Sequence, residues 1–339
     1  PRQPNIVGLA TGEGHNCVVV SDGTLRCWGD NGSHQLGADA EGTVPVLAPV
    51  PVSRLRSAVQ VAVGDAASCA VMRDGTVSCW GSNDYGRLST AAVSSQWTPG
   101  RWPGGGYRQV AIIAGLTCAR GRDGGVTCMG GPAHPFAPFS LALPGRAAAL
   151  AAGRARMCAL LHTGRVVCWN RELRTREHVA PFPAPPVELA VATHHACARL
   201  VDGTVACWGD GNLGQVGVGA VGDVLQPTRV AGLDDVVGIA VAQGRSCATR
   251  GDGSVWCWGS NRVETGLSGA GETFHAPTRL APIGPVQALQ LGDAHTCALL
   301  RGGPLCCWGS DVRGQLGRGE YDRHALGRVP DATPVPVRW

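Results

Sequence analysis

The sequence contains no lysine, and all 29 of its basic residues are arginine. Against 25 aspartates and glutamates they leave a formal net charge of only +4. A dedicated nucleic-acid binder carries a much larger basic excess, so we expect no nucleic-acid partner. Apolar runs of 18 or more residues are also missing, and we expect no membrane span. No charged and then apolar stretch follows Pro1, so a secretory leader is expected to be absent from this chain.

Aromatic residues are scarce at 5%, whereas the chain holds 50 glycines and 23 prolines. This composition, with a hydrophobic content of 44%, is typical of many short strands joined by many turns around a large core. The motifs of common enzymes are missing as well: the sequence has no GxSxG turn, HExxH pair, phosphate-binding loop or EF-hand spacing. We therefore assign no catalytic residue and expect no metal and no cofactor.

Fifteen cysteines recur in a regular pattern. Fourteen of them form seven pairs in which nine residues separate the two members, and Cys306 is left over. The first members of the pairs recur every 39 to 52 residues, which is the length of one supersecondary repeat, so the sequence predicts seven repeats. The pairs are Cys17 with Cys27, Cys69 with Cys79, Cys118 with Cys128, Cys158 with Cys168, Cys197 with Cys207, Cys247 with Cys257, and Cys297 with Cys307.

Each pair encloses a hairpin, as in CVVVSDGTLRC (17–27), where Asp-Gly is the turn. If Gly23 adopts the left-handed conformation of a three-residue loop, Val19 lies opposite Leu25 and Cys17 lies opposite Cys27. Partners at a non-hydrogen-bonded position have Cα atoms about 4.5 Å apart, which a disulfide tolerates. We therefore predict one disulfide per repeat, each contributing about 2 to 3 kcal/mol on the chain-entropy model.

Two other roles for these cysteines stay open. A zinc site needs four ligands in close groupings, and one hairpin supplies two. Buried free thiols pack well as small hydrophobes, although one spacing repeated seven times is then a coincidence. Disulfides place the protein outside the reducing cell, so we expect it to be secreted or otherwise extracytoplasmic.

Two further strands flank each hairpin. Strand A precedes the first cysteine, as in IVGLA (6–10) and VVGIAVA (236–242), and strands B and C form the hairpin. Strand D follows a long loop and often carries Pro-x-x-Val, as in PTRV (227–230), because proline is tolerated on an outermost strand. PVPVRW (334–339) is expected to supply the last strand D, so that the ring closes between the two ends of the chain.

A tryptophan follows the second cysteine in six of the seven repeats, and Met129 takes its place in the third. Side chains alternate along a strand, so each tryptophan points away from the disulfide face and is expected to pack against the adjacent blade. The six are Trp28, Trp80, Trp169, Trp208, Trp258 and Trp308.

The strings CWGDNGSHQLG (27–37), CWGDGNLGQVG (207–217) and CWGSDVRGQLG (307–317) resemble the WGxNxxGQLG motif of the regulator-of-chromosome-condensation family. GDAHTCALL (292–300) resembles its GxxHTxAL segment, and the resemblance extends over nearly the whole chain. It implies an all-β fold, a seven-bladed propeller of four-stranded antiparallel blades, here one domain over residues 1–339. The cysteines make this a disulfide-rich, bacterial-type member.

Members of this family have unrelated functions, so the fold does not fix an activity. A nuclear exchange factor does not fit a disulfide-rich chain, and the repeats of the plant ultraviolet-B receptor are matched here by GEGHN (12–16) and GDAHT (292–296), which lack its sensing tryptophan. The secreted bacterial inhibitor of β-lactamase, or an extracellular binder, remains nearest. We expect a monomeric secreted propeller that binds a protein or other macromolecule, with inhibition as one outcome; the alternatives are an extracytoplasmic scaffold and an enzyme with a site at the axial channel.

The expected binding face carries the A–B and C–D loops, because the B–C turns are short and stereotyped. Its charges fall on two arcs of the ring, acidic in blades seven, one and two and basic in blades four to six, unless chance alone sorted them. Such a division orients and steers a charged partner. The candidate residues are Glu13, Asp65, Arg154, Arg156, His194, His195, Arg245 and Asp293.

Blades three and four are shorter and lack the GQLG loop, which predicts a notch in the rim. Their C–D segments are MGGPAHPFAPF (129–139) and WNRELRTREH (169–178). Arg171, Arg174 and Arg176 are candidates to receive acidic groups there, although a solvated charged loop is the alternative.

Two further features stay open on sequence alone. His15, His195 and His295 share the position two before the first cysteine, where a structural hydrogen bond is favoured over a metal site. Cys306 is expected to point away from the side of Cys307, to the strand face that Trp256 occupies in its blade, as a buried inert thiol; a reactive thiol or an intermolecular disulfide is the alternative.

Overall fold

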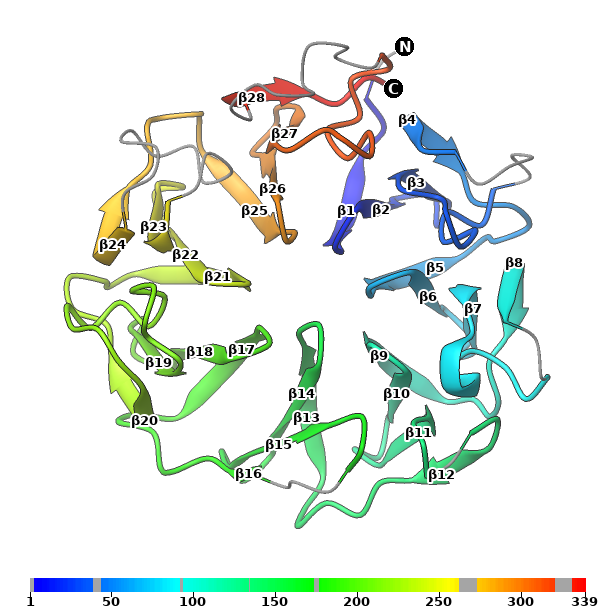
Figure 1. The fold of residues 1–339 in the computed structure, drawn as a ribbon, viewed down its shortest axis with the longest axis horizontal. Helices are drawn as coiled ribbons and strands as arrows, with labels where there is room; N and C mark the ends of the chain where they lie inside the picture. Colours follow the sequence, from blue (N-terminus) through cyan, green and yellow to red (C-terminus); the bar gives the residue numbers. More distant parts are fainter. Residues whose placement is uncertain are drawn as a thin grey trace.

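The computed structural model describes residues 3–38, 44–91, 94–133, 135–173, 177–261, 273–320 and 331–339. These residues form seven four-stranded antiparallel sheets, which stand as blades around a central axis (Figure 1). The blades follow one another in chain order, and the first blade lies beside the last. Within the described ranges, no helix is long and apolar enough to cross a membrane.

Strand A is the innermost strand of every blade, and strand B pairs with it. The A strands are β1 (Ile6–Thr11), β5 (Ala58–Val63), β9 (Tyr107–Ile113), β13 (Ala147–Ala152), β17 (Pro186–Val191), β21 (Val236–Ala242) and β25 (Val286–Leu291). The B strands are β2 (His15–Val20), β6 (Ala67–Met72), β10 (Leu116–Gly121), β14 (Arg156–Leu161), β18 (His195–Leu200), β22 (Arg245–Arg250) and β26 (His295–Leu300).

Strand C completes the hairpin, and strand D forms the outer edge. The C strands are β3 (Leu25–Gly29), β7 (Val77–Ser82), β11 (Val126–Gly130), β15 (Val166–Asn170), β19 (Val205–Gly209), β23 (Val255–Ser260) and β27 (Leu305–Gly309). The D strands are β4 (Val46–Pro51), β8 (Ser95–Arg101), β12 (Pro138–Ser140), β16 (Glu177–His178), β20 (Val224–Arg229), β24 (Thr273–Arg279) and β28 (Asp331–Pro336). The D strands of blades three and four are the shortest, as their short loops imply.

The predicted hairpin register is confirmed, and so are the predicted disulfides. Val19 pairs with Leu25, while Gly23 has φ +81°. All seven predicted pairs are bonded, with Cα atoms 4.0 to 4.2 Å apart. The bonds join Cys17 to Cys27, Cys69 to Cys79, Cys118 to Cys128, Cys158 to Cys168, Cys197 to Cys207, Cys247 to Cys257, and Cys297 to Cys307.

The leftover cysteine also lies where the sequence predicts. Cys306 is the one free cysteine, and it is buried. It lies opposite Ala298, on the strand face that Trp256 uses in blade six, where Trp256 lies opposite Ala248. Burial raises the pKa of the Cys306 thiol, which fits an inert side chain.

The core consists of the layers between blades. In the six hairpins that carry it, the tryptophan packs toward the preceding blade and meets that blade's disulfide, as Trp80 does in the layer that holds Cys17 and Cys27. Met129 takes this place in blade three. Trp28 packs in the same way with Cys297 and Cys307 across the seam between the ends of the chain. The inter-blade role predicted for the tryptophans is therefore confirmed.

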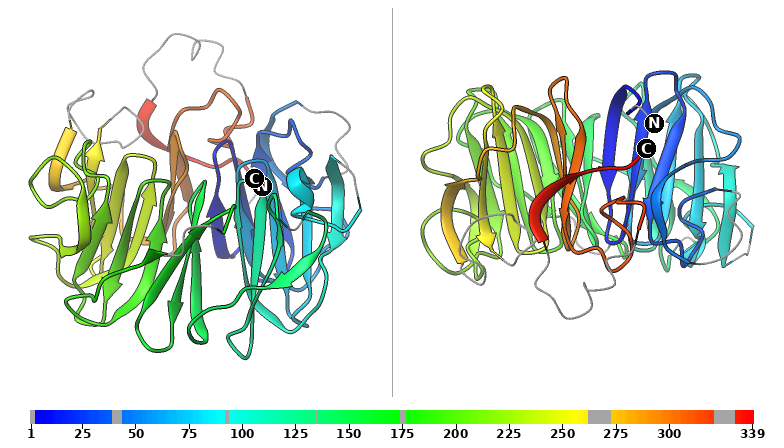
Figure 2. Two further views of the ribbon diagram at one scale, coloured as in Figure 1. Left: turned by 60° about the horizontal axis from the view of Figure 1, so that its bottom comes forward. Right: turned by 90° about the horizontal axis from the view of Figure 1, so that it is seen from above.

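The ring closes between blades one and seven without exchange of a strand, since each of these blades is one continuous segment of chain. Side chains join them instead: Asn16 Nδ2 donates to the Gln315 carbonyl (2.8 Å), and Trp339 packs edge-on against Trp28. The last strand D, β28, begins three residues before the predicted PVPVRW (334–339) segment and ends at Pro336. Figure 2 shows the two ends of the chain lying together at this seam.

Candidate functional site at the channel mouth

The two ends of the disc are built from different connections. The A–B turns and C–D loops meet on one end, as where Asp30 N donates to the Gly14 carbonyl; we call it the loop face. The B–C turns and the linkers from strand D to the next strand A meet on the other, as where Arg73 N donates to the Ser57 carbonyl; we call it the turn face.

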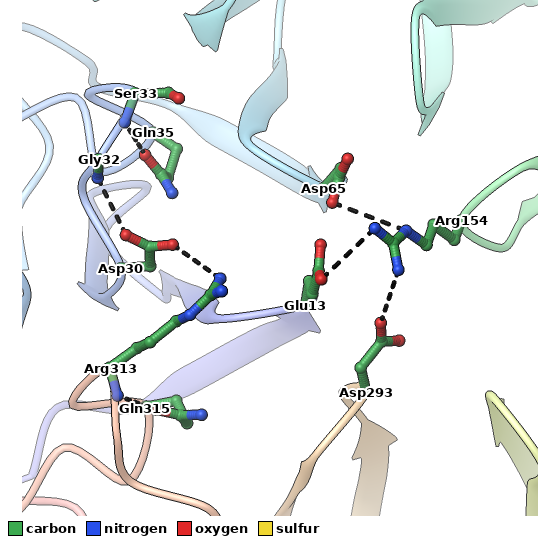
Figure 3. Close-up of polar contacts among 10 residues, drawn as sticks. All are labelled: Glu13, Asp30, Gly32, Ser33, Gln35, Asp65, Arg154, Asp293, Arg313 and Gln315. Carbon is green, nitrogen blue, oxygen red and sulfur yellow. Dashed lines mark hydrogen bonds and ion pairs between the residues drawn. The ribbon is translucent and has the colours of Figure 1, made fainter.

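Four charged side chains converge where the axial channel opens on the loop face (Figure 3). Each stands four residues before the first cysteine of its blade, at the tip of an A–B turn: Glu13, Asp65, Arg154 and Asp293. Arg154 of blade four reaches across the channel to the three carboxylates. Its guanidinium nitrogens lie 3.5 Å from Glu13 Oε1, 3.9 Å from Asp65 Oδ1 and 3.9 Å from Asp293 Oδ2.

The carboxylates of this cluster do not titrate alike. A hydrogen bond with Asp65, together with burial, raises the pKa of Glu13 from 4.5 to about 7. The same hydrogen bond lowers the pKa of Asp65, while burial raises the pKa of Asp293. Glu13 is therefore partly protonated near neutral pH, so Arg154 faces less than three full negative charges.

The hollow at this mouth is small. Its volume is about 80 Å³, and it is lined by the ends of the A strands and their turns, including Gly12, Gly64, Gly153 and Gly292. Sites for small molecules usually measure roughly 300 to 1,000 Å³. The geometry therefore suits contact with a side chain of another molecule rather than enclosure of a substrate.

Arg156 and Arg245, the other two arginines of the predicted arc, do not line the channel mouth. Arg245 is 3% exposed and donates to the carbonyls of Gly292 (2.6 Å) and His295 (2.8 Å), so it joins blade six to blade seven. Arg156 forms an ion pair with Glu177 on strand D of its own blade. Because these two arginines stand two positions before the cysteine instead of four, they leave the turn tip that faces the mouth.

His194 and His195 also separate. His194 is exposed, whereas its neighbour His195 is buried. Successive side chains at the start of a strand point to opposite sides, so only the first of the two stays available to another molecule.

The three aligned histidines make hydrogen bonds between blades. His15 Nε2 lies 2.9 Å from Ser68 Oγ, and Ser68 Oγ donates onward to the Gln35 carbonyl (2.9 Å). Trp80 Nε1 donates to the same carbonyl at 2.8 Å. His195 with Ser246 and His295 with Asn16 repeat the arrangement at two other seams. Burial lowers the pKa values of His15 and His195 to about 4 and that of His295 to about 3.

The GQLG loops serve these same seams. Their glutamines, Gln35, Gln215 and Gln315, present the carbonyls that the tryptophan of the next blade binds. Each glutamine side chain also accepts a hydrogen bond from the backbone NH two residues earlier. In blade two Arg87 stands at this position, buried, and donates to the carbonyls of Ser82 and Ile113. The residues that carry the family resemblance are thus structural.

The predicted notch over blade three is bridged. Arg171 of blade four stacks over the ring of Tyr85 from blade two, with its guanidinium carbon 5.2 Å from the ring centre. The Tyr85 ring lies on Gly115, where a Cβ would come within 2.8 Å of it. Arg174 and Arg176 lie outside the described residues. Arg171 also pairs with Glu172 at 3.9 Å, so its charge is shared within the rim.

Sequence reasoning missed the exposed aromatic side chains of this face. Trp97, in the first half of β8, is 64% exposed and stacks on His34 of blade one, with ring centres 4.5 Å apart. Tyr85 is 45% exposed. His34 and Tyr85 have φ near +60°. His34 stands at the loop position that holds Gly214 and Gly314 in blades five and seven, and Tyr85 stands one residue before the equivalent glycine of blade two. The available signal was the substitution of a bulky residue for glycine at His34 within the repeated motif.

Comparison with known proteins agrees with this architecture. Two family models, each described as the Regulator of chromosome condensation (RCC1) repeat, match residues 6–35 and 58–87 and residues 22–71 and 202–249. The chain carries RCC1 repeats.

Curated relatives share these repeats at low identity. The RCC1 domain-containing protein RUG3, mitochondrial, of Arabidopsis thaliana is 25% identical over 263 residues, which is 68% of this chain and 59% of RUG3. The X-linked retinitis pigmentosa GTPase regulator homolog of Caenorhabditis elegans is 35% identical over 24% of this chain and 6% of its own length. The chain thus spans less than two thirds of the length of both relatives.

Solved structures share the fold. Human WBSCR16 superposes with a TM-score of 0.77 at 21% identity, covering 89% of this chain and 88% of that one. Prp20p from Saccharomyces cerevisiae, whose structure was described together with its binding to Gsp1p and histones, gives 0.78 at 20% identity, covering 97% and 86%. RCC1 propellers commonly bind proteins, and the seven disulfides here suggest an oxidising compartment.

Proposed function

We propose that this chain is a secreted binding propeller that holds a protein partner on its loop face. The observation that carries the proposal is the pair of exposed, fixed aromatic side chains, Trp97 and Tyr85, on the same face as the charged mouth. Aromatic side chains surrounded by polar groups are typical anchors of protein interfaces. If the partner is an enzyme bound across its active site, the consequence is inhibition.

Backbone conformation supports the same face. A residue other than glycine in the left-handed region costs about 1 to 2 kcal/mol, and such positions cluster at functional sites. His34 and Tyr85 both adopt it, and each holds its ring against a neighbouring side chain, Trp97 or Arg171. These rings therefore lose little conformational freedom when another molecule binds them.

The small hollow argues against the enzyme alternative, since Arg154 already occupies the space between the three carboxylates. The scaffold alternative predicts polar, featureless loops, and the exposed aromatics argue against it. We place the contact on the loop face around Trp97, Tyr85 and the mouth cluster.

The experiment is capture of proteins from the native secretome on the immobilised chain, compared among three forms. The variant that combines Trp97→Ala with Tyr85→Ala tests the anchors. Val201→Ala, which removes a side chain 65% exposed on the turn face, is the control. We expect a protein retained by the wild type and the control and lost, by about tenfold or more, with the anchor variant. Equal retention by all three forms, or no retained protein, contradicts the proposal.

A further inference from the structure

The turn face carries a second charged surface, separate from the loop face of the proposed function. Eight exposed arginines gather on it, all in blades two to four. We call this set the basic patch: Arg54, Arg56, Arg73, Arg101, Arg108, Arg122, Arg146 and Arg165. They come from the linkers before strand A, the start of β9, the B–C turns, the end of β8 and the residue before β15.

Backbone hydrogen bonds hold the patch together. Arg73 N donates to the Ser57 carbonyl, Arg122 N to the Gly106 carbonyl and His162 N to the Arg146 carbonyl. Each of these joins a B–C turn to the linker that carries neighbouring arginines. The charges therefore stand on a rigid surface that crosses three consecutive blades.

None of the eight makes an ion pair within the part of the chain that the structure describes. Asp74 and Asp123 are carboxylates of the B–C turns in these blades, and each accepts a hydrogen bond from a turn NH: Thr76 N to Asp74 Oδ1 (2.9 Å) and Gly125 N to Asp123 Oδ1 (3.0 Å). Against the eight arginines, these two carboxylates leave a large local excess of positive charge.

The opposite arc of the same face shows what such arginines bind. Arg199 pairs with Glu188 at 2.8 Å, Arg229 with Asp202 at 2.7 Å, and Arg250 with Asp234. Arg229 and Arg101 hold equivalent positions at the ends of their D strands, as do Asp202 and Asp74 in their turns. In blades five and six carboxylates form ion pairs with these arginines, whereas none of the eight arginines of the basic patch forms one among the described residues.

We propose that the basic patch binds a carboxylate-rich surface of a protein partner. The planar guanidinium matches a carboxylate with two parallel hydrogen bonds. Among the described residues, the large exposed apolar side chains on this face are valines, including Val59 and Val187, so it offers no aromatic platform for unpaired bases. Asp74 and Asp123 lie among the arginines and repel the fixed phosphates of a stiff duplex, whereas the flexible carboxylate side chains of a protein or peptide can turn away from them.

The test uses the full chain and poly-L-glutamate as the probe. The patch variant combines Arg56→Gln, Arg108→Gln and Arg146→Gln. The control variant combines Arg229→Gln, Arg279→Gln and Arg301→Gln, which removes three exposed arginines from the same face in blades five to seven and changes the net charge equally. We expect the patch variant to bind about tenfold more weakly and the control less than about twofold, with affinity falling as salt rises.

Two further measurements complete the design. Chemical modification of arginine, followed residue by residue with mass spectrometry, is expected to show protection of the basic patch when poly-L-glutamate is bound. Duplex DNA and phosphatidylcholine vesicles containing phosphatidylserine are measured at the same ionic strength. Equal weakening in both variants overturns the patch, and tighter binding of DNA or vesicles overturns the protein partner. Either result leaves the loop-face proposal standing.

Discussion

The two faces of the disc treat arginine in opposite ways. On the loop face Arg154 reaches across the channel to three carboxylates, so the charges compensate one another within the molecule. On the turn face of blades two to four, Arg108 and its neighbours have no such partner among the described residues. The difference teaches that one repeated frame can pair its charges across the ring on one face and leave arginines without ion pairs on the other.

Reducing the disulfides should have the largest effect, because they hold the frame under both faces. Each closes a loop between neighbouring strands and contributes about 2 to 3 kcal/mol on the chain-entropy model. We expect reduction to lower the melting temperature by roughly 10 °C or more and to expose both faces to proteolysis together. Thermal denaturation with and without reductant measures this. If proteolysis cut one face while the other stayed protected, the two faces would not depend on the same disulfide-linked blades.

Reversing one arginine on each face tests the comparison directly. Arg154→Glu places a fourth carboxyl among three, and we expect the melting temperature to fall by roughly 3 to 8 °C at pH 8. Arg108→Glu breaks no ion pair that the structure describes and should change it by less than about 1 °C. Calorimetry of both variants measures the two melting temperatures. Equal losses would mean that the turn-face arginines are structural too.

The raised pKa of Glu13 predicts that the stability of the fold depends on pH. Because Glu13 has a raised pKa in the folded chain, its stabilising contribution is complete below about pH 4.5 and is lost as the pH rises through about 7. Glu13→Gln keeps an uncharged partner for Asp65 and should raise the melting temperature by roughly 1 to 3 °C at pH 8 and hardly at all at pH 5.

The melting temperature of Glu13→Gln must be compared with that of the wild type at each pH, because other groups titrate as well. The buried histidines act oppositely, since their lowered pKa values remove stability as the pH falls below 6.5. Glu320→Gln, at an exposed carboxylate outside the channel lining, is the control. If Glu13→Gln raised the melting temperature equally at both pH values, the raised pKa of Glu13 would be contradicted.

The smallest effect is expected from neutralising the basic patch. Like charges repel, so the patch variant with Arg56→Gln, Arg108→Gln and Arg146→Gln should melt slightly higher, by up to about 2 °C at low salt, and the gain should vanish at high salt. Arg154→Gln should instead lower the melting temperature. A loss of stability in the patch variant would indicate contacts that these arginines make within the fold.

Sequence reasoning predicted the repeated frame more fully than the site. The spacing of Cys17 and Cys27 around one turn was enough for the register and the disulfide, because pairing across a hairpin is local. The same reasoning placed Trp28 between blades. The basic arc was misplaced: Arg154 and Arg245 both stand near an A–B turn, but two residues of difference send one into the channel and the other between blades. Sequence reasoning overlooked the turn face because its B–C turns look alike, while five of the eight arginines of the basic patch lie outside those turns.

The amino-acid sequence by itself determined the number of blades, the strand order and the covalent links, since each depends on contacts within about fifty residues. Only the tertiary structure decided which charges meet. Glu13, Asp65, Arg154 and Asp293 are far apart in the chain, and closure of the ring brings their turns to one axis. The arginines of blades two to four became a surface for the same reason: neighbouring linkers and turns interlock on one end of the disc, and among the described residues no carboxylate arrives there to pair with them.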